Sequence, residues 1–382
     1  MFSRLLTVVT LLTGLALALP AAAIETIARE AVLIEAATGA VLFDKNADTP
    51  MPPASMSKMM TIYMVFERLR DGRLSLDDKL SVSENAWRRG GVKSGSSTMF
   101  LEPRSRVRVE DLLRGIIVQS GNDACIVMAE NLSGSELTFA EEMTQKARAL
   151  GMTGSTFKNS TGWPHPEHRM TSRDLAILAQ RTIADFPDYY RYYSEKTFTY
   201  NGIRQNNRNR LLYKDMGADG LKTGHTSEAG YGLTSSAARG NRRLILVVNG
   251  LPSNKDRFRE SERLLEWGFR EFNNYALFKA GEQVETAAVW LGNSPTVPLL
   301  IGRDVLITLP KKSRLGMKVT INYQGPVPAP VAMGDPLAML RIEAPDVETI
   351  EIPLTAGADV QQLGLMGRLG AAFNHIVFGD AK

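Results

Sequence analysis

The chain has 382 residues, of which 44% are hydrophobic and 23% are charged, and its formal net charge is +4. This length allows more than one domain, and the composition is that of a folded globular protein, which excludes a largely disordered chain. The small excess of positive charge does not indicate nucleic-acid binding. A single cysteine, Cys125, excludes a disulfide within the chain.

The N-terminal segment has the pattern of a secretory signal peptide. A basic start at residues 1–4 precedes a nearly apolar run over residues 5–19, and Pro-Ala-Ala-Ala follows. This pattern predicts a signal peptide over residues 1–23, cleaved before Ile24. An uncleaved anchor is the alternative, although the run is short for a membrane span. No later segment has about 20 consecutive apolar residues, so no transmembrane helix is predicted.

The next segments predict a strand hairpin and then a buried helix. Residues 30–46 hold two strand-like runs around Ala-Thr-Gly. In the stretch "PPASMSKMMTIYMVFERL" (52–69), two prolines lead into an almost wholly apolar helix that has Ser55 and Lys58 near its start. Residues 71–110 are rich in turn formers, and "RRGGVKSGSS" (88–97) predicts a loop.

The middle of the chain is predicted to be helical. Residues 109–132 indicate two helical pieces interrupted at Ser120-Gly121-Asn122. Amphipathic helices are expected at 138–151 and at 171–186, the second capped by Thr171 or Ser172. Cys125 lies in the apolar stretch "DACIVMAENL" and is interpreted as a core residue, with a catalytic thiol as the lesser alternative.

From residue 220 the pattern changes to strands and then returns to helix. Three runs, at 220–226, 229–239 and 242–250, predict consecutive strands, and 256–272 predicts a helix. Strands near both ends of residues 24–278, with helices between them, predict an α+β or α/β layered domain.

Two further parts follow this domain. Short strand-like runs between frequent turns predict a small all-β domain over residues 279–360. In residues 361–382 a helical projection gathers apolar side chains on one side, namely Leu365, Met366, Leu369, Phe373, Ile376 and Val377. This predicts an amphipathic helix at a membrane surface. A helix docked on the protein itself is the alternative.

Three short motifs occur in order along the chain: Ser55-x-x-Lys58, Ser120-Gly121-Asn122 and Lys222-Thr223-Gly224. Residues i and i+3 share one face of a helix, so Ser55 and Lys58 are expected to meet. A lysine activates a serine only when it is neutral, and burial favours its neutral form. A surface lysine behind a capping serine is the alternative for this motif alone.

Together the motifs resemble the active-site set of the penicillin-binding protein and serine β-lactamase superfamily. Flanking stretches such as "PASMSKMMT", "VQSGNDAC" and "DGLKTGHTSEAGYGL" resemble the low-molecular-weight D-alanyl-D-alanine carboxypeptidases of peptidase family S11. The resemblance covers roughly residues 25–275. It implies an α+β fold: an antiparallel sheet with helices on its faces, an all-helical subdomain, then the β-rich domain and the terminal helix.

The resemblance also implies roles for individual residues. Ser55 would be the acyl-ester nucleophile, Lys58 the proton acceptor and Ser120 a proton relay. Substrate binding would involve Asn122, Lys222, Thr223, Gly224, His225 and Arg208. The N–H groups of Ser55 and His225 would form the oxyanion hole, and Arg210 is the alternative to Arg208.

The implied activity is removal of the terminal D-alanine from peptidoglycan stem peptides, with β-lactams acylating the same serine. A periplasmic enzyme attached to the outer face of the inner membrane is expected. No cofactor is expected. His165 and His168 suggest a metal site, but without a third ligand they are interpreted as loop residues.

Other functions stay open at this point. A β-lactamase of class A would need a glutamate in an E-x-x-L-N loop, and residues 130–200 contain no such motif. A D,D-endopeptidase is a closer alternative. A non-catalytic, penicillin-sensing or wall-binding scaffold is a third, and the intact Ser55, Lys58, Ser120 and Lys222 argue against it.

Overall fold

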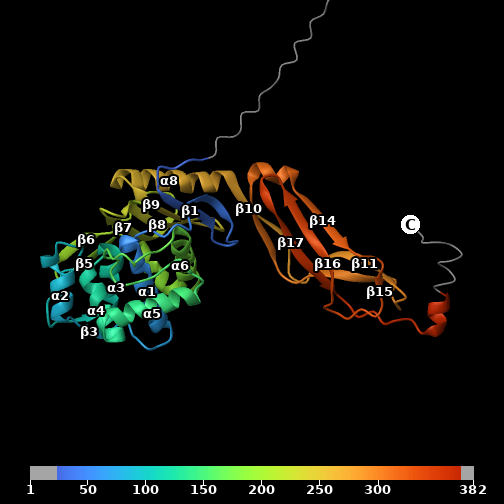
Figure 1. Cartoon of the computed structure of the whole chain (residues 1–382), viewed down its shortest axis with the longest axis horizontal. Coiled ribbons are helices and arrows are strands. Elements are labelled where there is room, and N and C mark those ends of the chain that lie inside the picture. Colours follow the sequence, from blue (N-terminus) through green and yellow to red (C-terminus); the bar gives the residue numbers. More distant parts are fainter. Residues whose placement is uncertain (1–23, 371–382) are drawn as a thin grey trace, which may run out of the picture.

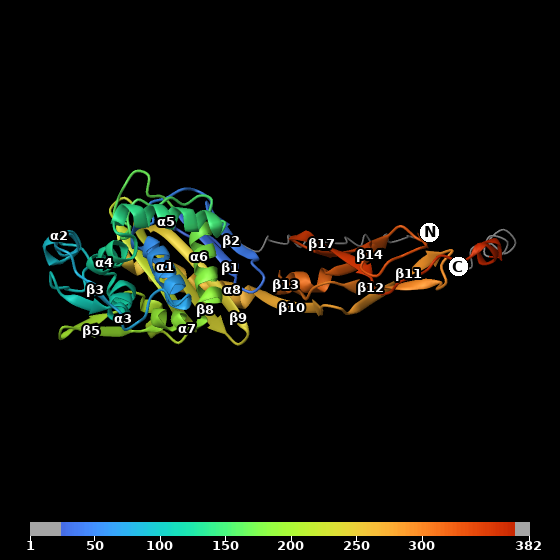
Figure 2. The same ribbon diagram turned by 90° about the horizontal axis from the view of Figure 1, so that it is seen from below.

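A computed structural model describes residues 24–370. The predicted signal peptide and the end of the predicted terminal helix lie outside the described residues. Figure 1 shows an N-terminal unit of mixed helices and strands, from which a long helix leads into an elongated β-rich unit. Figure 2 shows that the β-rich unit extends away from the first unit at the end of this helix. The predicted α+β fold followed by a β-rich domain is confirmed.

The N-terminal unit is built on one five-stranded sheet whose neighbouring strands are all antiparallel. The strand order is β2-β1-β9-β8-β7, so β7 lies at an edge with one side unpaired within the sheet. The strands are β1 (Glu30–Glu35), β2 (Val41–Lys45), β7 (Ala218–Thr226), β8 (Gly230–Arg239) and β9 (Arg242–Leu251). The hairpin predicted at 30–46 is formed by β1 and β2.

Successive side chains of β1 alternate between two hydrophobic cores, one on each face of this sheet. Val32 and Ile34 pack in the core that holds α1 (Lys58–Arg70) and α6 (Ser172–Asp185). Ala31 and Leu33 pack in the core under α8 (Asn254–Glu271). Because successive residues of a strand point to opposite faces, one apolar strand supplies both cores. Helix α1 therefore lies between the sheet and the helical region, and this position buries its first turn.

The helical region covers the face of the sheet that carries α1 (Figure 1). Its elements are β3 (Lys79–Ser81), α2 (Glu84–Gly90), η2 (Val92–Ser94), β4 (Arg106–Arg108), α3 (Val109–Arg114), the π-helical turn η3 (Gly115–Gln119), α4 (Asn122–Ser133) and α5 (Glu136–Ala149). The loop prediction for 88–97 is wrong at its start, because residues 88–90 complete α2. Ser83 caps the start of this helix by accepting a hydrogen bond from the N–H of Ala86.

Short elements complete the unit between α6 and β7. They are α7 (Pro187–Tyr190), η4 (Arg191–Ser194), β5 (Thr197–Tyr200), β6 (Ile203–Asn206) and η5 (Arg210–Tyr213). At the start of α6, Thr171 accepts a hydrogen bond from the N–H of Asp174, as the capping pattern predicted. The 3-10 turn η1 (Ala54–Ser57) runs directly into α1, so Ser55 stands on this turn and Lys58 begins the helix.

The β-rich unit contains two sheets. β10 (Phe272–Phe278) pairs with β13 (Val305–Pro310), and the six-stranded sheet has the order β14-β16-β17-β12-β11-β15. The remaining elements are β11 (Gln283–Trp290), β12 (Thr296–Ile301), η6 (Lys311–Gly316), β14 (Lys318–Tyr323), β15 (Val327–Pro328), β16 (Pro336–Ala344) and β17 (Val347–Ala356). By its pairing with β13, β10 belongs to this unit, whereas the sequence predicted that the first domain extends to residue 278.

After β17 the chain remains attached to the β-rich unit as far as residue 363. Val360 and Gln362 form bridges to Val331 and Gly292, and the N–H of Leu363 donates to the carbonyl of Leu291. Residues 365–370 are helical, and Leu365, Met366 and Leu369 are exposed in this turn. Within residues 24–370, no helix combines the length and the apolar character needed to cross a bilayer.

Candidate active site

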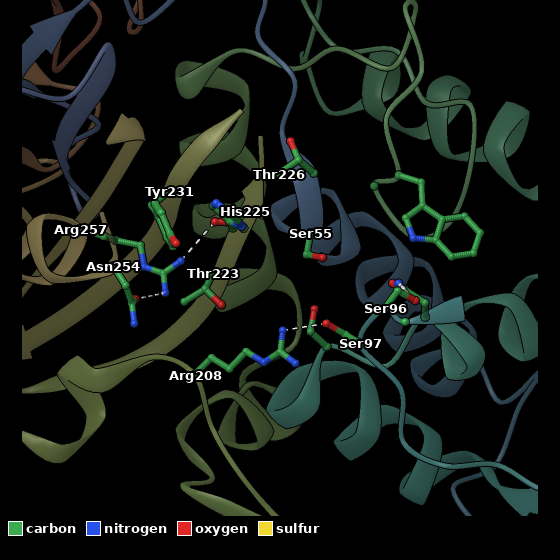
Figure 3. Close-up of a pocket in the computed structure, with 16 residues that line it drawn as sticks. Ser55, Ser96, Ser97, Arg208, Thr223, His225, Thr226, Tyr231, Asn254 and Arg257 are labelled. Atoms are coloured by element: carbon green, nitrogen blue, oxygen red, sulfur yellow. Dashed lines mark hydrogen bonds between the residues drawn. The ribbon is translucent and has the colours of Figure 1, made fainter. Parts of the chain in front are cut away.

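The three sequence motifs meet around one cavity of about 450 Å³. Figure 3 shows Ser55 between the side chains of β7 on one side and the loop of Ser96 and Ser97 on the other. The residues that line the cavity are Ser55, Gly95, Ser96, Ser97, Ser120, Asn122, Gly162, Trp163, Arg208, Thr223, Gly224, His225, Thr226, Tyr231, Asn254 and Arg257. The edge position of β7 leaves its outer side facing this space.

Ser55 and Lys58 form the centre of the site. The Nζ atom of Lys58 lies 2.9 Å from the Oγ atom of Ser55. Lys58 Nζ also donates to the carbonyl oxygen of Thr161, which comes from the loop between α5 and α6. Gly162 allows this approach, because a Cβ atom there would lie 2.0 Å from the carbonyl oxygen of Ala54. The loop thus packs directly on the turn that carries Ser55.

Burial changes the protonation of Lys58. Its side chain is fully buried, and this loss of solvation lowers the pKa of the amine from 10.5 to about 8. The Ser55 hydroxyl and the Thr161 carbonyl are neutral partners, so neither stabilises an ammonium as a carboxylate would. An amine with this pKa is partly neutral near pH 7 and can accept a proton from a hydroxyl.

Ser120 and Asn122 reach the cavity from the break between two helices. The π-helical turn η3 ends at Gln119, the next residue, Ser120, has a left-handed φ of 67°, and α4 begins at Asn122. Asn122 Nδ2 donates to the Oγ of Ser96 at 2.9 Å. The Oδ1 atom of Asn122 is buried and has no hydrogen-bond partner among the described residues, so it is available to a peptide N–H.

A second buried lysine connects β7 to this break. Lys222 Nζ lies 3.0 Å from the Oγ of Ser120 and 3.1 Å from the carbonyl oxygen of Thr223. Burial lowers the pKa of Lys222 well below its ordinary value, and the nearby amine of Lys58 lowers it further. Two ammonium groups in one dry site repel each other, so protonation of one amine disfavours protonation of the other.

The next residues of β7 form one wall of the cavity. Thr223 is buried, and the ring of His225 stacks on Tyr231 with 3.9 Å between ring centroids. The resemblance implied a part in substrate binding for Gly224. The structure adds a packing reason, because a Cβ atom on Gly224 would lie 2.8 Å from the carbonyl oxygen of Pro53, beside the turn that carries Ser55.

Two arginines face the cavity, and the sequence suggested only one of them. Arg208 donates to the Oγ of Ser97 at 2.7 Å, whereas Arg210 stacks over Phe258 and does not line the cavity. Arg257 is buried and donates to the carbonyl oxygens of Gly224 and Gly232. It lies in the helix predicted at 256–272, where nothing in the sequence distinguishes it from the other arginines.

The remaining candidates lie outside this arrangement. The Nδ1 atom of His168 accepts a hydrogen bond from the N–H of Lys158, and burial lowers the pKa of His168 to about 3. His165 is exposed, and residues 24–370 contain no group of three or more side chains suited to hold a metal ion. Cys125 is buried in the core, where loss of solvation raises the pKa of its thiol to about 12.

Comparison with known proteins agrees with this geometry. Residues 18–253 match the family model described as D-alanyl-D-alanine carboxypeptidase. The chain belongs to this family. Residues 272–362 match a second model, the C-terminal domain of penicillin-binding protein 5.

Individual relatives cover most of the chain. D-alanyl-D-alanine carboxypeptidase DacC of Escherichia coli (strain K12) is 39% identical over 345 residues, which are 90% of this chain and 86% of the relative. DacA of the same strain is 37% identical over 342 residues, 88% of this chain and 85% of the relative. The crystal structure of penicillin binding protein 5 from Haemophilus influenzae superposes with a TM-score of 0.80 at 37% identity, covering 89% of this chain and 99% of that one.

These matches confirm the expected membership in the S11 carboxypeptidases. The chain is accordingly a serine-type D-alanyl-D-alanine carboxypeptidase of the penicillin-binding kind. The residues of the family motifs and those of the cavity coincide at Ser55, Ser120, Asn122, Thr223, Gly224 and His225. Lys58 and Lys222 lie directly behind them and contact Ser55 and Ser120.

Proposed function

We propose that the chain removes the C-terminal D-alanine from peptidoglycan stem peptides through an acyl-enzyme on Ser55. The contact between the Lys58 amine and the Ser55 hydroxyl, in a site that lowers the pKa of that amine, is the observation that carries this proposal. Lys58 accepts the proton of Ser55 as the oxygen attacks the carbonyl of the penultimate D-alanine. The ester bond to Ser55 forms and the D-Ala-D-Ala amide bond breaks.

Other residues serve the same step. The N–H groups of Ser55 and His225 stabilise the oxyanion, and each such donor is worth about 3 kcal/mol. Ser120 passes a proton to the leaving amine, a role supported by its contact with Lys222 Nζ at 3.0 Å. Water then hydrolyses the ester and regenerates Ser55.

Substrate binding divides between the two sides of the cavity. Thr223, Lys222 and Arg208 bind the terminal carboxylate, and the guanidinium of Arg208 is the charged donor among them, whose hydrogen bonds are the stronger ones. Asn122 binds the peptide group through its unpaired Oδ1. The outer side of β7 pairs with the extended substrate, and this pairing is supported by the edge position of the strand. A penicillin, whose carboxylate and amide resemble those of the peptide, acylates the same serine.

The test of this function is D-alanine release. The protein without residues 1–23 is incubated with a peptide that ends in D-Ala-D-Ala, and free D-alanine is measured over time. Wild type should release D-alanine, and Ser55→Ala should release none while keeping the melting temperature of wild type. Equal release by both proteins would refute the nucleophile, and no release by wild type would refute the activity. Fast penicillin hydrolysis would instead indicate a β-lactamase.

The proposed location is the periplasm, with the protein held on the inner membrane by an amphipathic helix in residues 361–382. The exposed Leu365, Met366 and Leu369 support this proposal, because they do not dock on the described part of the protein. Removal of residues 364–382 keeps the contacts of residues 360–363 with the β-rich unit. This truncation should lose binding to anionic phospholipid vesicles and retain D-alanine release. Equal vesicle binding by the full-length and truncated proteins would contradict the attachment.

A further inference from the structure

A buried carboxylate lies directly behind the substrate-binding wall of the cavity. The side chain of Asp123, the second residue of α4, is fully buried. Its two oxygens accept hydrogen bonds from the Oγ1 of Thr98 at 2.6 Å and from the N–H groups of Met99, Leu101 and Ala124 at 3.0, 3.2 and 2.9 Å. Three of these four donors come from the loop at residues 95–101, and the fourth comes from α4 itself.

The same loop orients two of the groups proposed to bind substrate. Ser96 Oγ accepts a hydrogen bond from Asn122, and Ser97 Oγ accepts one from Arg208. The carbonyl oxygen of Ser97 also accepts from the N–H of Asn122 at 2.8 Å. Neither Ser96 nor Ser97 contacts Asp123 in these bonds, so the carboxylate acts on both of them only through the loop that it holds.

Close packing leaves the carboxylate little freedom to rearrange. A Cβ atom on Gly90 would lie 2.3 Å from the backbone nitrogen of Asp123, and a Cβ atom on Gly121 would lie 2.9 Å from its Oδ1. Every donor around Asp123 is an N–H or O–H group that needs an acceptor in a buried place. An asparagine would present an NH₂ group to one set of these donors, and an alanine would leave all of them unpaired.

We propose that Asp123 is a positioning residue for substrate recognition, which fixes the loop at 95–101 so that Asn122 and Arg208 face the substrate. This inference rests on the proposed function, in which Arg208 binds the terminal carboxylate. Loss of the Asp123 anchor lets the loop move away from α4. Ser97 then no longer orients the Arg208 guanidinium, and the enzyme loses its preference for a substrate with a free carboxylate.

The test compares two peptides that differ only at the C-terminus, one ending in D-Ala-D-Ala acid and one in the corresponding amide. Enzyme concentrations are normalised by titration with labelled penicillin, so that unfolded protein is not counted. The readout is the ratio of kcat/KM for the acid to kcat/KM for the amide. A variant that is only less stable changes the amount of active enzyme equally for both peptides and leaves this ratio unchanged.

We expect Asp123→Asn to lower the acid-to-amide ratio at least about fivefold, through a higher KM for the acid peptide, since a hydrogen bond to a charged group contributes strongly to binding. Thr98→Val removes the 2.6 Å bond to Asp123, together with the bond that Thr98 Oγ1 accepts from the N–H of Phe100 at 3.1 Å, and should lower the ratio about twofold. The matched control is Asp174→Asn. Asp174 is also a buried aspartate at the start of a helix and accepts from Ser155 Oγ at 2.6 Å, but it does not line the cavity.

The outcomes separate the inference from the function on which it rests. A wild-type ratio in both Asp123→Asn and Thr98→Val would overturn the inference. An equal fall in Asp174→Asn would overturn it too, because the effect would then follow from stability alone. If Asp123→Asn does not fold, the ratio in Thr98→Val decides. Absence of D-alanine release by wild type is a failure of the proposed function instead.

Discussion

The protonation of Lys58 predicts how the rate of Ser55 acylation depends on pH. Only the neutral amine accepts the proton of Ser55, and burial lowers the pKa of this amine to about 8. The neutral fraction is then about 9% at pH 7, about 50% at pH 8 and about 90% at pH 9. The acylation rate with labelled penicillin should therefore rise about tenfold between pH 7 and pH 9 and level off above pH 9.

The assay is a stopped time course of labelled penicillin incorporation, from pH 6 to pH 10, at penicillin concentrations below saturation. Melting temperatures at each pH identify any loss of folded protein. Lys214→Met is the matched control, because Lys214 is an exposed lysine paired with Glu262, and its profile should equal that of wild type. A rate that does not change with pH would refute the lowered pKa of Lys58, and so would a rate that still rises steeply between pH 9 and pH 10, as expected for a solvent-exposed lysine.

Three further predictions concern the packing around the site. Gly162→Ala should slow acylation at least tenfold and cost roughly 2 kcal/mol or more of stability. The reason is that Gly162 has a φ of 79° and that the new Cβ would collide with the Ala54 carbonyl. Unchanged kinetics would contradict the packing of this loop. Lys58→Met should abolish acylation. Burial of the protonated Lys58 amine destabilises wild type, and this cost is fully present below pH 8 and disappears as pH rises toward 10.5. Wild type should therefore gain about 2 kcal/mol of stability over this variant between pH 7 and pH 10 in urea unfolding. An equal difference at both pH values would contradict the lowered pKa. Phe66→Ala, which removes the ring packed against Phe186, should cost about 3–5 kcal/mol in the same assay, and a loss below 1 kcal/mol would contradict the packing of α1.

Local patterns were sufficient to predict much of the site. The i,i+3 spacing placed Ser55 and Lys58 together, and the apolar run after Lys58 predicted the burial that lowers its pKa. The break at Ser120 followed from a helical pattern interrupted at Ser-Gly-Asn. These features depend on residues close together in the sequence, where helix periodicity and turn chemistry act directly.

Contacts between distant segments were not predictable from these patterns. The carbonyl of Thr161 faces Lys58 only because the loop between α5 and α6 folds back over η1. Arg257 reaches the cavity from α8, and the sequence of that helix shows only its amphipathic period. The anchoring of the loop at 95–101 on Asp123 likewise joins residues about 25 positions apart. Each of these contacts depends on tertiary packing, which cannot be predicted from the local hydrophobic periodicity of one sequence.

The central claim is that Lys58 activates Ser55 as the nucleophile of the site. Its most direct test is mass spectrometry of the protein after reaction with a penicillin. One penicilloyl group should be found on the peptide that contains Ser55, and Lys58→Met should carry none although its fold is intact. A penicilloyl group on another residue, or full labelling of Lys58→Met at the wild-type rate, would contradict the account.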